Sequence, residues 1–390
     1  MASGQALIGT EVTNTLAAEQ FNGVHRVALE LLRRSPTIEP LRSLADKPGQ
    51  FRRLTPGERF AVQRGLVPGR AFATRIARRL PGEARRRFSD TFNLATDVAE
   101  VDVFCDVEAA WLNPWSRRDL LPHLHRFAVA TAAVVHDVAP ITNPQWFEPA
   151  STFRFERYLK AHLEHRSHFF CISQHTRIQL RDVAAEMGHP DPSTSVLPMG
   201  ALKADAIPSP DGPGSSPMLL MVGTLEPRKN HAFALDLFDR LDSEGTDVEL
   251  QLVGSRGWKS SDLVARITNH RHYGERLRWR SGLSDTALAE LYTDAAAVLV
   301  PSLDEGFGLP VIEALAHGTP VIASDHPALR EAGGTYARYA GSPDRWHSMV
   351  THLLDPAEQA AVRNRLSRYS PASWDESAEV LNSKLKELAE

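Results

Sequence analysis

Two carboxylates stand on either side of a Gly-Phe-Gly turn in the stretch SLDEGFGLPVIEALAHGTPVIASD, residues 302–325. The acids are Glu305 and Glu313, and the turn contains Gly306 and Gly308. Glycines at the start of a helix let several backbone N–H groups point outward at the positive end of the helix dipole, which suits a phosphate. Carboxylates repel phosphate, so we expect the two acids to receive hydroxyl groups on either side of it. A ligand with hydroxyls, then phosphates, then further hydroxyls is a nucleotide sugar.

Two adjacent cations follow an earlier apolar run, in the stretch VGTLEPRKNH of residues 222–231. Arg228 and Lys229 stand at the predicted entry to a helix, where the helix dipole opposes positive charge, so their placement favours an anion between them. A planar guanidinium and a compact ammonium can together clamp a diphosphate. A purely structural interpretation also exists, in which the cations form a solvated cluster and the glycine turn is a plain helix cap. That interpretation gives no role to Glu305 and Glu313, the acids on either side of the turn.

The pattern around the glycine turn predicts the elements that hold it in place. Residues 297–300 form a short apolar run typical of a buried strand, and residues 320–323 form another. Between them, Pro310 suits the first position of a helix, and Gly318 suits the position just after its end. The stretch is therefore predicted to be a strand–helix–strand crossover of a parallel sheet.

The rest of the chain repeats this alternation, which specifies doubly wound parallel sheets. In the second half, the predicted strands are 218–222, 248–253 and 277–279, and the predicted helices are 230–241, 263–270 and 284–294, the last capped by Ser284. In the first half, the predicted strands are 6–9, 101–105, 132–135 and 169–172, with a helix over 23–32.

A chain of 390 residues is too long for one ordinary hydrophobic core, so we expect two domains. The stretch IPSPDGPGSSP contains four prolines and predicts a linker. We assign residues 1–205 to the first doubly wound domain, 206–217 to the linker and 218–371 to the second domain. Residues 372–390 are predicted to be a helix that either completes the second domain or crosses back to the first. The ligand cleft is expected between the carboxyl ends of the two sets of strands.

Composition restricts the class of protein further. With 42% apolar and 24% charged residues, the chain has the composition of a soluble globular protein, and a net charge of −4 gives no reason to expect nucleic-acid binding. Cys105 and Cys171 both lie in apolar runs, where buried free thiols are expected. The sequence shows neither a leader pattern nor an apolar run approaching the ~18 residues that span a bilayer, so a cytoplasmic location is predicted.

An arginine-rich segment differs from the rest of the first half. Eleven arginines lie between Asp46 and Asn93, interleaved with apolar residues at helical spacing. A solvated basic face on a surface helix is the favoured interpretation. The alternative is contact with an anionic acceptor or with an acidic membrane surface through residues 52–87, which would make the protein peripheral at the inner face of the membrane.

The two motifs together resemble the retaining GT-B glycosyltransferases of the group 1, or family 4, type. The resemblance is specific over residues 218–325, where the Arg-Lys pair and Glu-Gly-Phe-Gly-Leu-Pro occur in the family's order and at a family-like spacing. It is looser over residues 1–200, where FNGVHRVALELL resembles the first glycine loop, VVHDVAPITNP a His-Asp strand end, CISQHTR the switch segment and VLPMGA the end of the first domain. The segment GTLEPRKN most resembles the corresponding segment of mannosyl- and rhamnosyltransferases of bacterial polysaccharide assembly.

The resemblance implies an α/β fold of GT-B architecture, with an acceptor-binding first domain and a donor-binding second domain that face a central cleft. It implies transfer of a hexose from a nucleoside diphosphate sugar to the hydroxyl of a carbohydrate or lipid-linked acceptor, with retention of configuration. The sugar nucleotide is a co-substrate, and neither a cofactor nor a metal is implied, because two cations can replace a divalent ion at the diphosphate.

The resemblance also assigns roles to residues. Arg228 and Lys229 resemble the cations that hold the diphosphate and stabilise the leaving nucleotide. Glu305 resembles the carboxylate that orients the donor sugar, and Glu313 the one that binds the ribose diol. Backbone N–H groups of the turn would assist Glu305, and the turn consists of Gly306, Phe307, Gly308 and Leu309.

Four further positions come from the looser parts of the resemblance. His136 resembles the first-domain histidine near the reacting carbon, although a buried histidine with only a structural role has the same appearance. Gly23 resembles the loop glycine under the phosphates; the family usually has more glycines there than NTLAAEQFNG offers. Gly254 and Leu283 follow later strands and would line the base pocket.

The donor and the reaction class leave alternatives open. GDP-mannose is the favoured donor, followed by dTDP-rhamnose and then UDP-sugars, and Arg256 and Trp258 are expected near the base. A nucleotide-sugar epimerase would share the cleft without needing an acceptor. A dehydrogenase would need G-x-G-x-x-G directly after a strand, and EGFGLP has only the first two of those glycines. A non-catalytic binding protein would have no need for all four charged residues of the two motifs.

Overall fold

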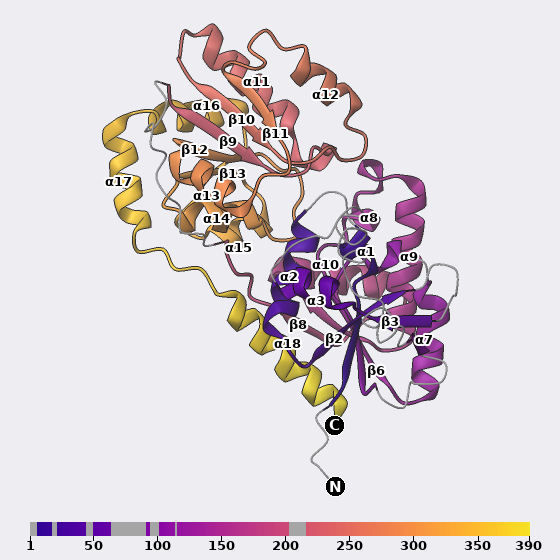
Figure 1. Ribbon diagram of the computed structural model, residues 1–390. Helices are drawn as coiled ribbons and strands as arrows, with labels where there is room; N and C mark the ends of the chain where they lie inside the picture. Colours follow the sequence, from indigo (N-terminus) through magenta and orange to yellow (C-terminus); the bar gives the residue numbers. More distant parts are fainter. Residues whose placement is uncertain are drawn as a thin grey trace.

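The computed structural model describes residues 6–17, 22–43, 50–63, 91–93, 101–113, 115–202 and 216–390. Two sheets flanked by helices form two lobes, which Figure 1 shows one above the other. The first lobe contains the strands before residue 202 and is coloured indigo to magenta. The second lobe contains the strands after residue 216 and is coloured pink to orange.

One sheet forms the centre of the first lobe. Its described strands are β1 (Ile8–Glu11), β2 (Ile38–Ser43), β3 (Gln50–Arg53), β4 (Thr91–Asn93), β5 (Val103–Asp106), β6 (Ala130–Val135), β7 (His168–Cys171) and β8 (Thr194–Val196). They lie in the order β4-β3-β2-β1-β5-β6-β7-β8. The pairs from β2 to β8 are parallel, whereas β3 and β4 extend the β2 edge in antiparallel fashion.

The helices of this lobe cover the sheet on both faces, which explains why its central strands are buried apolar runs. They are α1 (Thr13–Ala17), α2 (Gly23–Arg34), α3 (Pro56–Gln63), α7 (Arg117–Arg126), α8 (Ala139–Thr142), α9 (Pro149–Glu164) and α10 (Gln174–Glu186), with short 3₁₀ turns η2 (Ala110–Leu112) and η3 (Pro144–Trp146).

The sheet of the second lobe is parallel throughout its described strands. These are β9 (Met218–Val222), β10 (Glu249–Val253), β11 (Leu277–Arg280), β12 (Ala297–Val300), β13 (Val321–Ser324) and β14 (Arg338–Ala340), in the order β11-β10-β9-β12-β13-β14. The order reverses direction between β9 and β12. Doubly wound sheets bind ligands at the carboxyl ends of the strands at such a reversal, and both sequence motifs directly follow these two strands.

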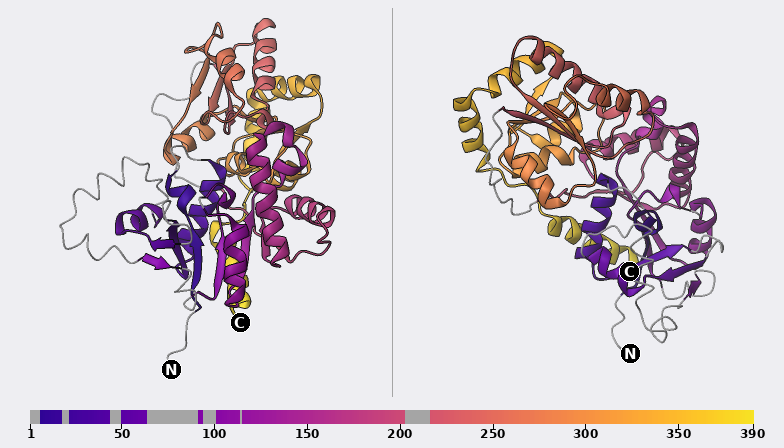
Figure 2. Two further views of the ribbon diagram at one scale, coloured as in Figure 1. Left: turned by 90° about the vertical axis from the view of Figure 1, so that its right-hand side faces the viewer. Right: turned by 45° about the horizontal axis from the view of Figure 1, so that its top comes forward.

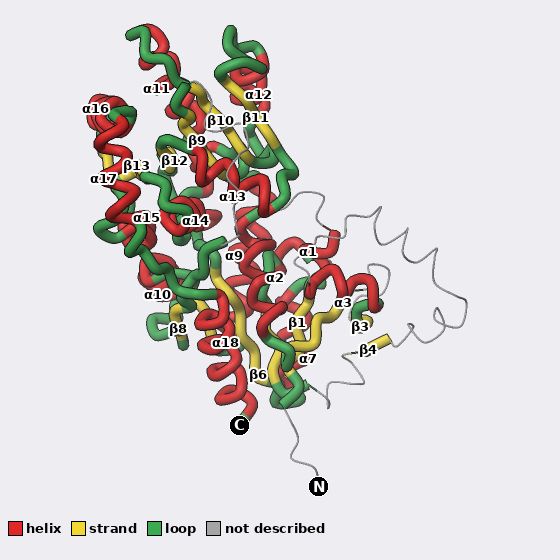
Figure 3. The backbone as a smooth tube through the Cα atoms, turned by 60° about the vertical axis from the view of Figure 1, so that its left-hand side comes forward, coloured by secondary structure: helices red, strands yellow, loops and turns green. Residues whose placement is uncertain are grey.

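The helical elements of the second lobe are η4 (Pro227–Lys229), α11 (His231–Ser243), α12 (Ser261–Thr268), α13 (Asp285–Asp294), α14 (Leu309–Ala316), α15 (Pro327–Gly333), α16 (Pro343–Leu353) and α17 (Pro356–Leu366). The expected cap of α13 is present, since the Ser284 hydroxyl accepts the Ala287 N–H at 3.2 Å. The tube in Figure 3 shows α15 directly above α10 of the first lobe, and these two helices are in contact.

The last helix, α18 (Trp374–Ala389), leaves the second lobe and packs on α2 of the first, as the yellow ribbon in Figure 2 shows. It begins with a capping box between Ser373 and Glu376. At its start, Trp374 lies so close to Gly200 that a Cβ on this glycine would be 2.5 Å from the indole. Of the two paths expected for this helix, the chain follows the one back to the first lobe.

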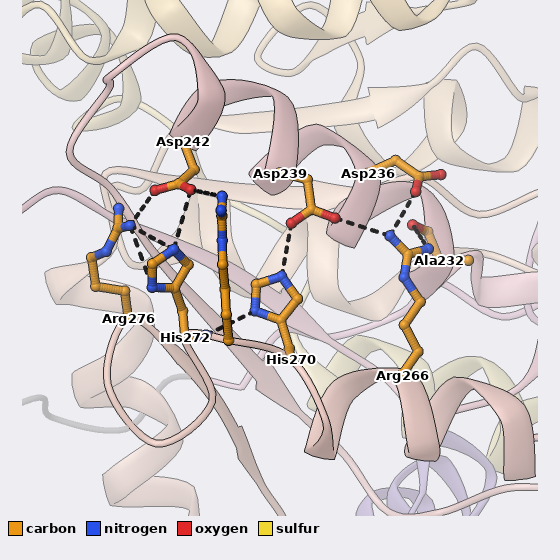
Figure 4. A network of polar contacts seen from close by, with 9 residues as sticks. Ala232, Asp236, Asp239, Asp242, Arg266, His270, His272 and Arg276 are labelled. Carbon is orange, nitrogen blue, oxygen red and sulfur yellow. Dashed lines mark hydrogen bonds and ion pairs between the residues drawn. The ribbon is translucent and has the colours of Figure 1, made fainter.

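A network of charged side chains on the outside of the second lobe ties α11 to the segment around α12 and β11 (Figure 4). We call it the outer network. Its acids repeat every three residues along one face of α11, and its members are Asp236, Asp239, Asp242, Arg266, His270, Arg271, His272 and Arg276. Hydrogen bonds from Arg276 and His272 outweigh desolvation and lower the pKa of Asp242 to about 2.

The α/β prediction of two doubly wound sheets is confirmed, and outside the arginine-rich segment every predicted strand and helix begins and ends within two residues of an observed one. Cys105 and Cys171 are buried free thiols, as expected. The assigned domain boundaries stay predictions, because residues 203–215 lie outside the described part of the chain.

The helical pattern assigned to the arginine-rich segment is wrong where the structure describes it, except over α3. Residues 50–53 form a strand that pairs with β2, and residues 91–93 form a strand that pairs with residues 50–53, so pairing at a sheet edge overrides the helical spacing. Residues 64–90 lie outside the described part, and with them the contact proposed for residues 52–87.

Candidate functional site

The Lys229–Glu305 pair is the centre of the site. The left-handed conformation of Asn230, with φ of 60°, and its hydrogen bond of 3.2 Å to the Pro301 carbonyl turn the chain after β9 toward the end of β12. The Lys229 ammonium donates to the Glu305 carboxylate, and the Ser302 hydroxyl donates to the same oxygen at 2.9 Å. Burial raises the pKa of Glu305, but the charges of Lys229 and Arg228 outweigh it, so the pKa lies below its ordinary value. Glu305 is therefore a buried carboxylate at neutral pH.

Arg228 lies beside this pair and reaches the first lobe. Its Nε donates to Glu226 Oε1 at 2.5 Å, and its Nη1 lies 3.3 Å from Asp137 Oδ2 of the first lobe. Burial works against the charge, but Glu226 and Asp137 outweigh it and raise the pKa of Arg228 further. Within the described residues, the buried Nη1 has no hydrogen-bond partner of good geometry. The guanidinium thus keeps a donor for an anion.

The glycine turn lies against the first lobe. A Cβ on Gly306 would lie 1.8 Å from the His136 carbonyl oxygen, so only glycine allows this approach. The Gly306 carbonyl accepts hydrogen bonds from the hydroxyls of Ser173 and Thr176, the latter at 3.0 Å. Gly308 adopts a φ of 106° at the N-cap of α14, whose first turn has no side-chain cap. Pro310 has no N–H and Val311 donates to the Gly308 carbonyl at 2.9 Å, which leaves the Leu309 N–H at the start of α14 for another partner.

His136 lies at the carboxyl end of β6, next to this turn. Its Nε2 is 3.4 Å from the Val107 carbonyl oxygen, and burial lowers its pKa to about 4, so the ring is neutral at pH 7. Gly23 opens α2, where a Cβ would lie 3.7 Å from Leu309. That is an ordinary contact distance, so the protein itself does not require glycine at position 23. His136 and Gly23 thus both lie next to the glycine turn, the first against Gly306 and the second against Leu309.

Glu313 faces away from this centre and is 3% exposed. It accepts a hydrogen bond of 2.8 Å from Tyr292, and Arg26 Nε lies 3.7 Å from its other oxygen. Burial raises the pKa of Glu313 despite the opposing charge of Arg26. Arg26 also donates to Asp285 at 2.9 Å, so it connects the first turn of α2 to the second lobe.

The positions assigned to the base pocket behave differently from one another. A Cβ on Gly254 would lie 1.9 Å from the Gly223 carbonyl oxygen, so this glycine keeps the ends of β9 and β10 together. Leu283 is partly buried against the core. Trp258 stacks on Phe147 of the first lobe, with ring centroids 5.5 Å apart. Its indole joins the lobes in this arrangement, and its place near a base stays a prediction.

Several contacts across the lobes were missed in the sequence. They involve Arg26, Ser173 and Thr176. All three lie in segments that resemble the family, but the resemblance assigns none of them a role of its own. A signal exists only for Arg26, which lies three residues after Gly23 and so within one helical turn of it. Together these contacts close the two lobes onto the glycine turn.

Residues 204–372 match the family model described as glycosyl transferases group 1. The match lies entirely within the second half of the chain. Its residues include both motifs, so the resemblance to the group 1 glycosyltransferases is confirmed, including the likeness to mannosyltransferases.

Curated relatives carry mannosyltransferase names. The serotype-specific mannosyltransferase WbdA of Escherichia coli is 33% identical over 273 residues, which cover 66% of this chain and 33% of WbdA. The O-antigen chain mannosyltransferase B of Escherichia coli is 27% identical over 272 residues, which cover 65% of this chain and 69% of that protein. The chain thus spans about a third of the length of WbdA.

Solved structures confirm the GT-B fold. Anabaena Alr3699/HepE in complex with UDP and glucose superimposes with a TM-score of 0.67 at 13% identity, covering 98% of this chain and 99% of HepE. Sucrose-phosphate synthase from Thermosynechococcus elongatus gives 0.65 at 17% identity, with coverages of 98% and 99%. In the described residues, no helix is both long and apolar enough to cross a membrane. The cytoplasmic location and the membrane contact stay predictions.

Proposed function

We propose that this chain is a retaining glycosyltransferase that moves a hexose, with mannose favoured, from a nucleoside diphosphate sugar to an acceptor hydroxyl in polysaccharide or glycoconjugate assembly. The observation that carries the proposal is the convergence of three anion-binding features at the β9/β12 reversal. They are the Lys229 ammonium, the Arg228 guanidinium, whose Nη1 lies 3.3 Å from Asp137 without a hydrogen bond, and the start of α14, which has no side-chain cap.

The diphosphate is the leaving group, and its developing negative charge must be stabilised as the bond to the sugar breaks. Lys229 and Arg228 lie beside the N-terminus of α14, where they can supply this stabilisation electrostatically without a metal. Lys229 is held by Glu305 in the donor-free arrangement. When a diphosphate draws the ammonium toward itself, the Glu305 carboxylate becomes an acceptor for the hydroxyls of the donor sugar.

The neighbouring residues would position the two ends of the donor. The backbone of His136 lies against the glycine turn, and its neutral ring would hydrogen-bond a sugar hydroxyl or the acceptor close to the reacting carbon. Glu313 would accept the ribose diol in exchange for its contact with Arg26. Gly23 would leave room for the phosphates next to Leu309, which fits the absence of a protein contact that demands glycine there.

The choice of donor rests on the mannosyltransferase names of the relatives, and it favours GDP-mannose over dTDP-rhamnose and UDP-sugars. Thermal unfolding in the presence of GDP, UDP or dTDP tests it, because a ligand at 100 times its Kd stabilises the fold by ~2.7 kcal/mol. We expect GDP to raise the melting temperature most. A shift with UDP or dTDP alone would exclude the mannose assignment and leave the transferase intact.

A direct assay separates the transferase from an epimerase. The chain is incubated with GDP-mannose alone and then with mannosylated acceptors, and release of GDP and conversion of the sugar are followed. We expect acceptor-dependent release of GDP, unchanged by a chelator, and no new sugar nucleotide in the absence of acceptor. Isomerisation of the donor without an acceptor would contradict the proposed function.

A further inference from the structure

Two histidines and an aspartate meet where the lobes touch, and we call them the interlobe cluster. His175 lies in the first turn of α10, Asp304 follows β12, and His326 stands between β13 and α15. One potential ligand atom from each residue lies within 4.8 Å of the other two. The cluster draws on both lobes, because His175 belongs to the first and the other two residues to the second.

The spacing is close to that of a tetrahedral metal site. Zn²⁺ bonds of about 2.1 Å place the ligand atoms about 3.4 Å apart, and His326 Nε2 lies 3.3 Å from Asp304 Oδ1. The rings of His175 and His326 lie at 81° to each other with centroids 4.9 Å apart. The third ligand atom, on His175, lies within 4.8 Å of the other two and would have to move closer to complete the site.

One ligand atom of the cluster is buried and unsatisfied. Among the described residues, His175 Nε2 has no hydrogen-bond partner, which is costly for a polar atom withdrawn from water. Asp304 is 4% exposed, and the Asn143 amide donates to its second oxygen at 3.3 Å. The cluster therefore offers a lone pair without a partner next to a buried carboxylate, and a cation would satisfy both.

Binding a cation has one identifiable cost. His326 Nδ1 accepts the Ala328 N–H at 3.3 Å, so its proton is on Nε2 and faces Asp304. A cation at Nε2 requires the other neutral tautomer of the ring. The Nε2 proton is released to solvent, and Nδ1 takes up a proton from solvent in its place. The weak hydrogen bond to Ala328 is lost, which makes the expected affinity moderate.

We propose that His175, Asp304 and His326 bind a divalent transition metal of the zinc class and thereby join the two lobes. Two imidazoles and one carboxylate suit Zn²⁺ or Co²⁺, with water in the remaining position, and they do not suit Mg²⁺ or Ca²⁺, which prefer oxygen ligands. The site is separate from the diphosphate site, where Arg228 and Lys229 supply the positive charge.

The surroundings of the cluster indicate what the metal would do. The Glu331 carboxylate of α15 accepts the backbone N–H groups of Gln174 and His175, at 2.7 Å and 3.0 Å. Next to them, Ser173 and Thr176 hold the Gly306 carbonyl. A metal at the cluster adds one more bond to contacts that exist only while the lobes are closed. It would slow opening and, where product release limits turnover, inhibit transfer reversibly.

The site is tested on the full chain without a polyhistidine tag, after removal of metals with a chelator. Co²⁺ is titrated by its visible absorption and Zn²⁺ by calorimetry. We expect one equivalent of metal and a Co²⁺ spectrum of low coordination number. His175→Ala and His326→Ala should each lower the affinity by more than the about 10- to 100-fold lost with an outer-shell partner. His189→Ala is the control, since it removes a first-lobe histidine outside the cluster, and should bind as the parent does.

Folding of each variant is checked by thermal unfolding in the absence of metal, and His175→Gln replaces His175→Ala if the latter unfolds. In the transfer assay, Zn²⁺ should slow the parent chain and leave the His175 variant at its metal-free rate. The proposal is overturned if the parent takes up no metal, or if the cluster variants and the His189 control bind equally. If the rate depends on pH but no metal is taken up, the proposal is overturned as well. The cluster then binds a proton and not a metal.

Discussion

The outer network and the interlobe cluster use the same side chains in opposite ways. In the outer network, every aspartate faces at least one arginine or histidine, and Asp242 alone meets Arg271, His272 and Arg276 (Figure 4). The interlobe cluster pairs its aspartate with a histidine and an amide and leaves a buried nitrogen unsatisfied. A saturated set of charges holds elements together, whereas an incomplete one marks a place where something binds.

The Lys229 cation at the glycine turn and the cations of the outer network should differ in the same way. This difference gives the largest expected effect on turnover. Lys229→Ala should lower turnover by ~10²-fold or more, because removal of a charge that stabilises the transition state costs about 3 kcal/mol. Arg266→Ala removes a more exposed cation from the outer network and should leave kcat unchanged. Steady-state kinetics of both variants with GDP-mannose provide the measurement, and equal rates would remove the distinction between the two regions.

Gly306→Ala tests whether closure of the lobes matters for the reaction. The added Cβ would overlap the His136 carbonyl oxygen, so the turn must move away from the first lobe, and we expect turnover to fall by about tenfold to 10²-fold. Gly341→Ala is the matched control, since a Cβ at this position meets nothing within 4 Å. If both variants keep the parent rate, the contact between the lobes does not position the donor.

Asp242→Asn should lower the stability of the second lobe and leave kcat unaltered. The loss should be roughly 0.5–1 kcal/mol, as for other partly exposed ion-pair networks. Since the folded-state pKa of Asp242 is lowered to about 2, its contribution is complete above its ordinary value and disappears as the pH falls toward 2. Denaturant unfolding should therefore show a constant difference between variant and parent above about pH 5 and a narrowing one below about pH 4. A difference that grows in acid would contradict this account.

His272→Ala should have the smallest effect on metal binding. It removes a histidine that lies 3.1 Å from an aspartate, much as His326 lies 3.3 Å from Asp304. In the outer network, however, arginines already compensate the charge of the aspartate. Zn²⁺ affinity by calorimetry should stay within about twofold of the parent value, well short of the loss expected for a ligand. A large loss would mean that the interlobe cluster is not the metal site.

Much of the donor lobe could be predicted because its signals are local. Each strand is an apolar run, and each motif follows its strand within a few residues, so the reversal between β9 and β12 brings Lys229 and Glu305 together by topology alone. The strand and helix limits there followed from prolines, glycines and a serine cap. Local residue types were sufficient for this part of the site.

The contacts between the lobes could not be predicted, because they depend on how two separately folded sheets meet. The glycine at position 306 was assigned to phosphate binding, whereas the structure adds a second demand from the His136 carbonyl 170 residues earlier in the chain. The packing of Trp258 on Phe147 of the other lobe had no signal in the sequence either. The interlobe cluster combines residues from three strand ends, and none of the three has a motif of its own.

The contact between Gly200 and Trp374 determines how the two halves can move. The chain leaves the first lobe just after Gly200 and returns to it at Trp374, and a Cβ on that glycine would touch the tryptophan. The first-lobe ends of both covalent crossings therefore meet at one point, which can act mechanically as a pivot. Rotation about this point displaces residues in proportion to their distance from it. A small change of angle would therefore widen the space between the lobes most on the side far from Gly200 and Trp374.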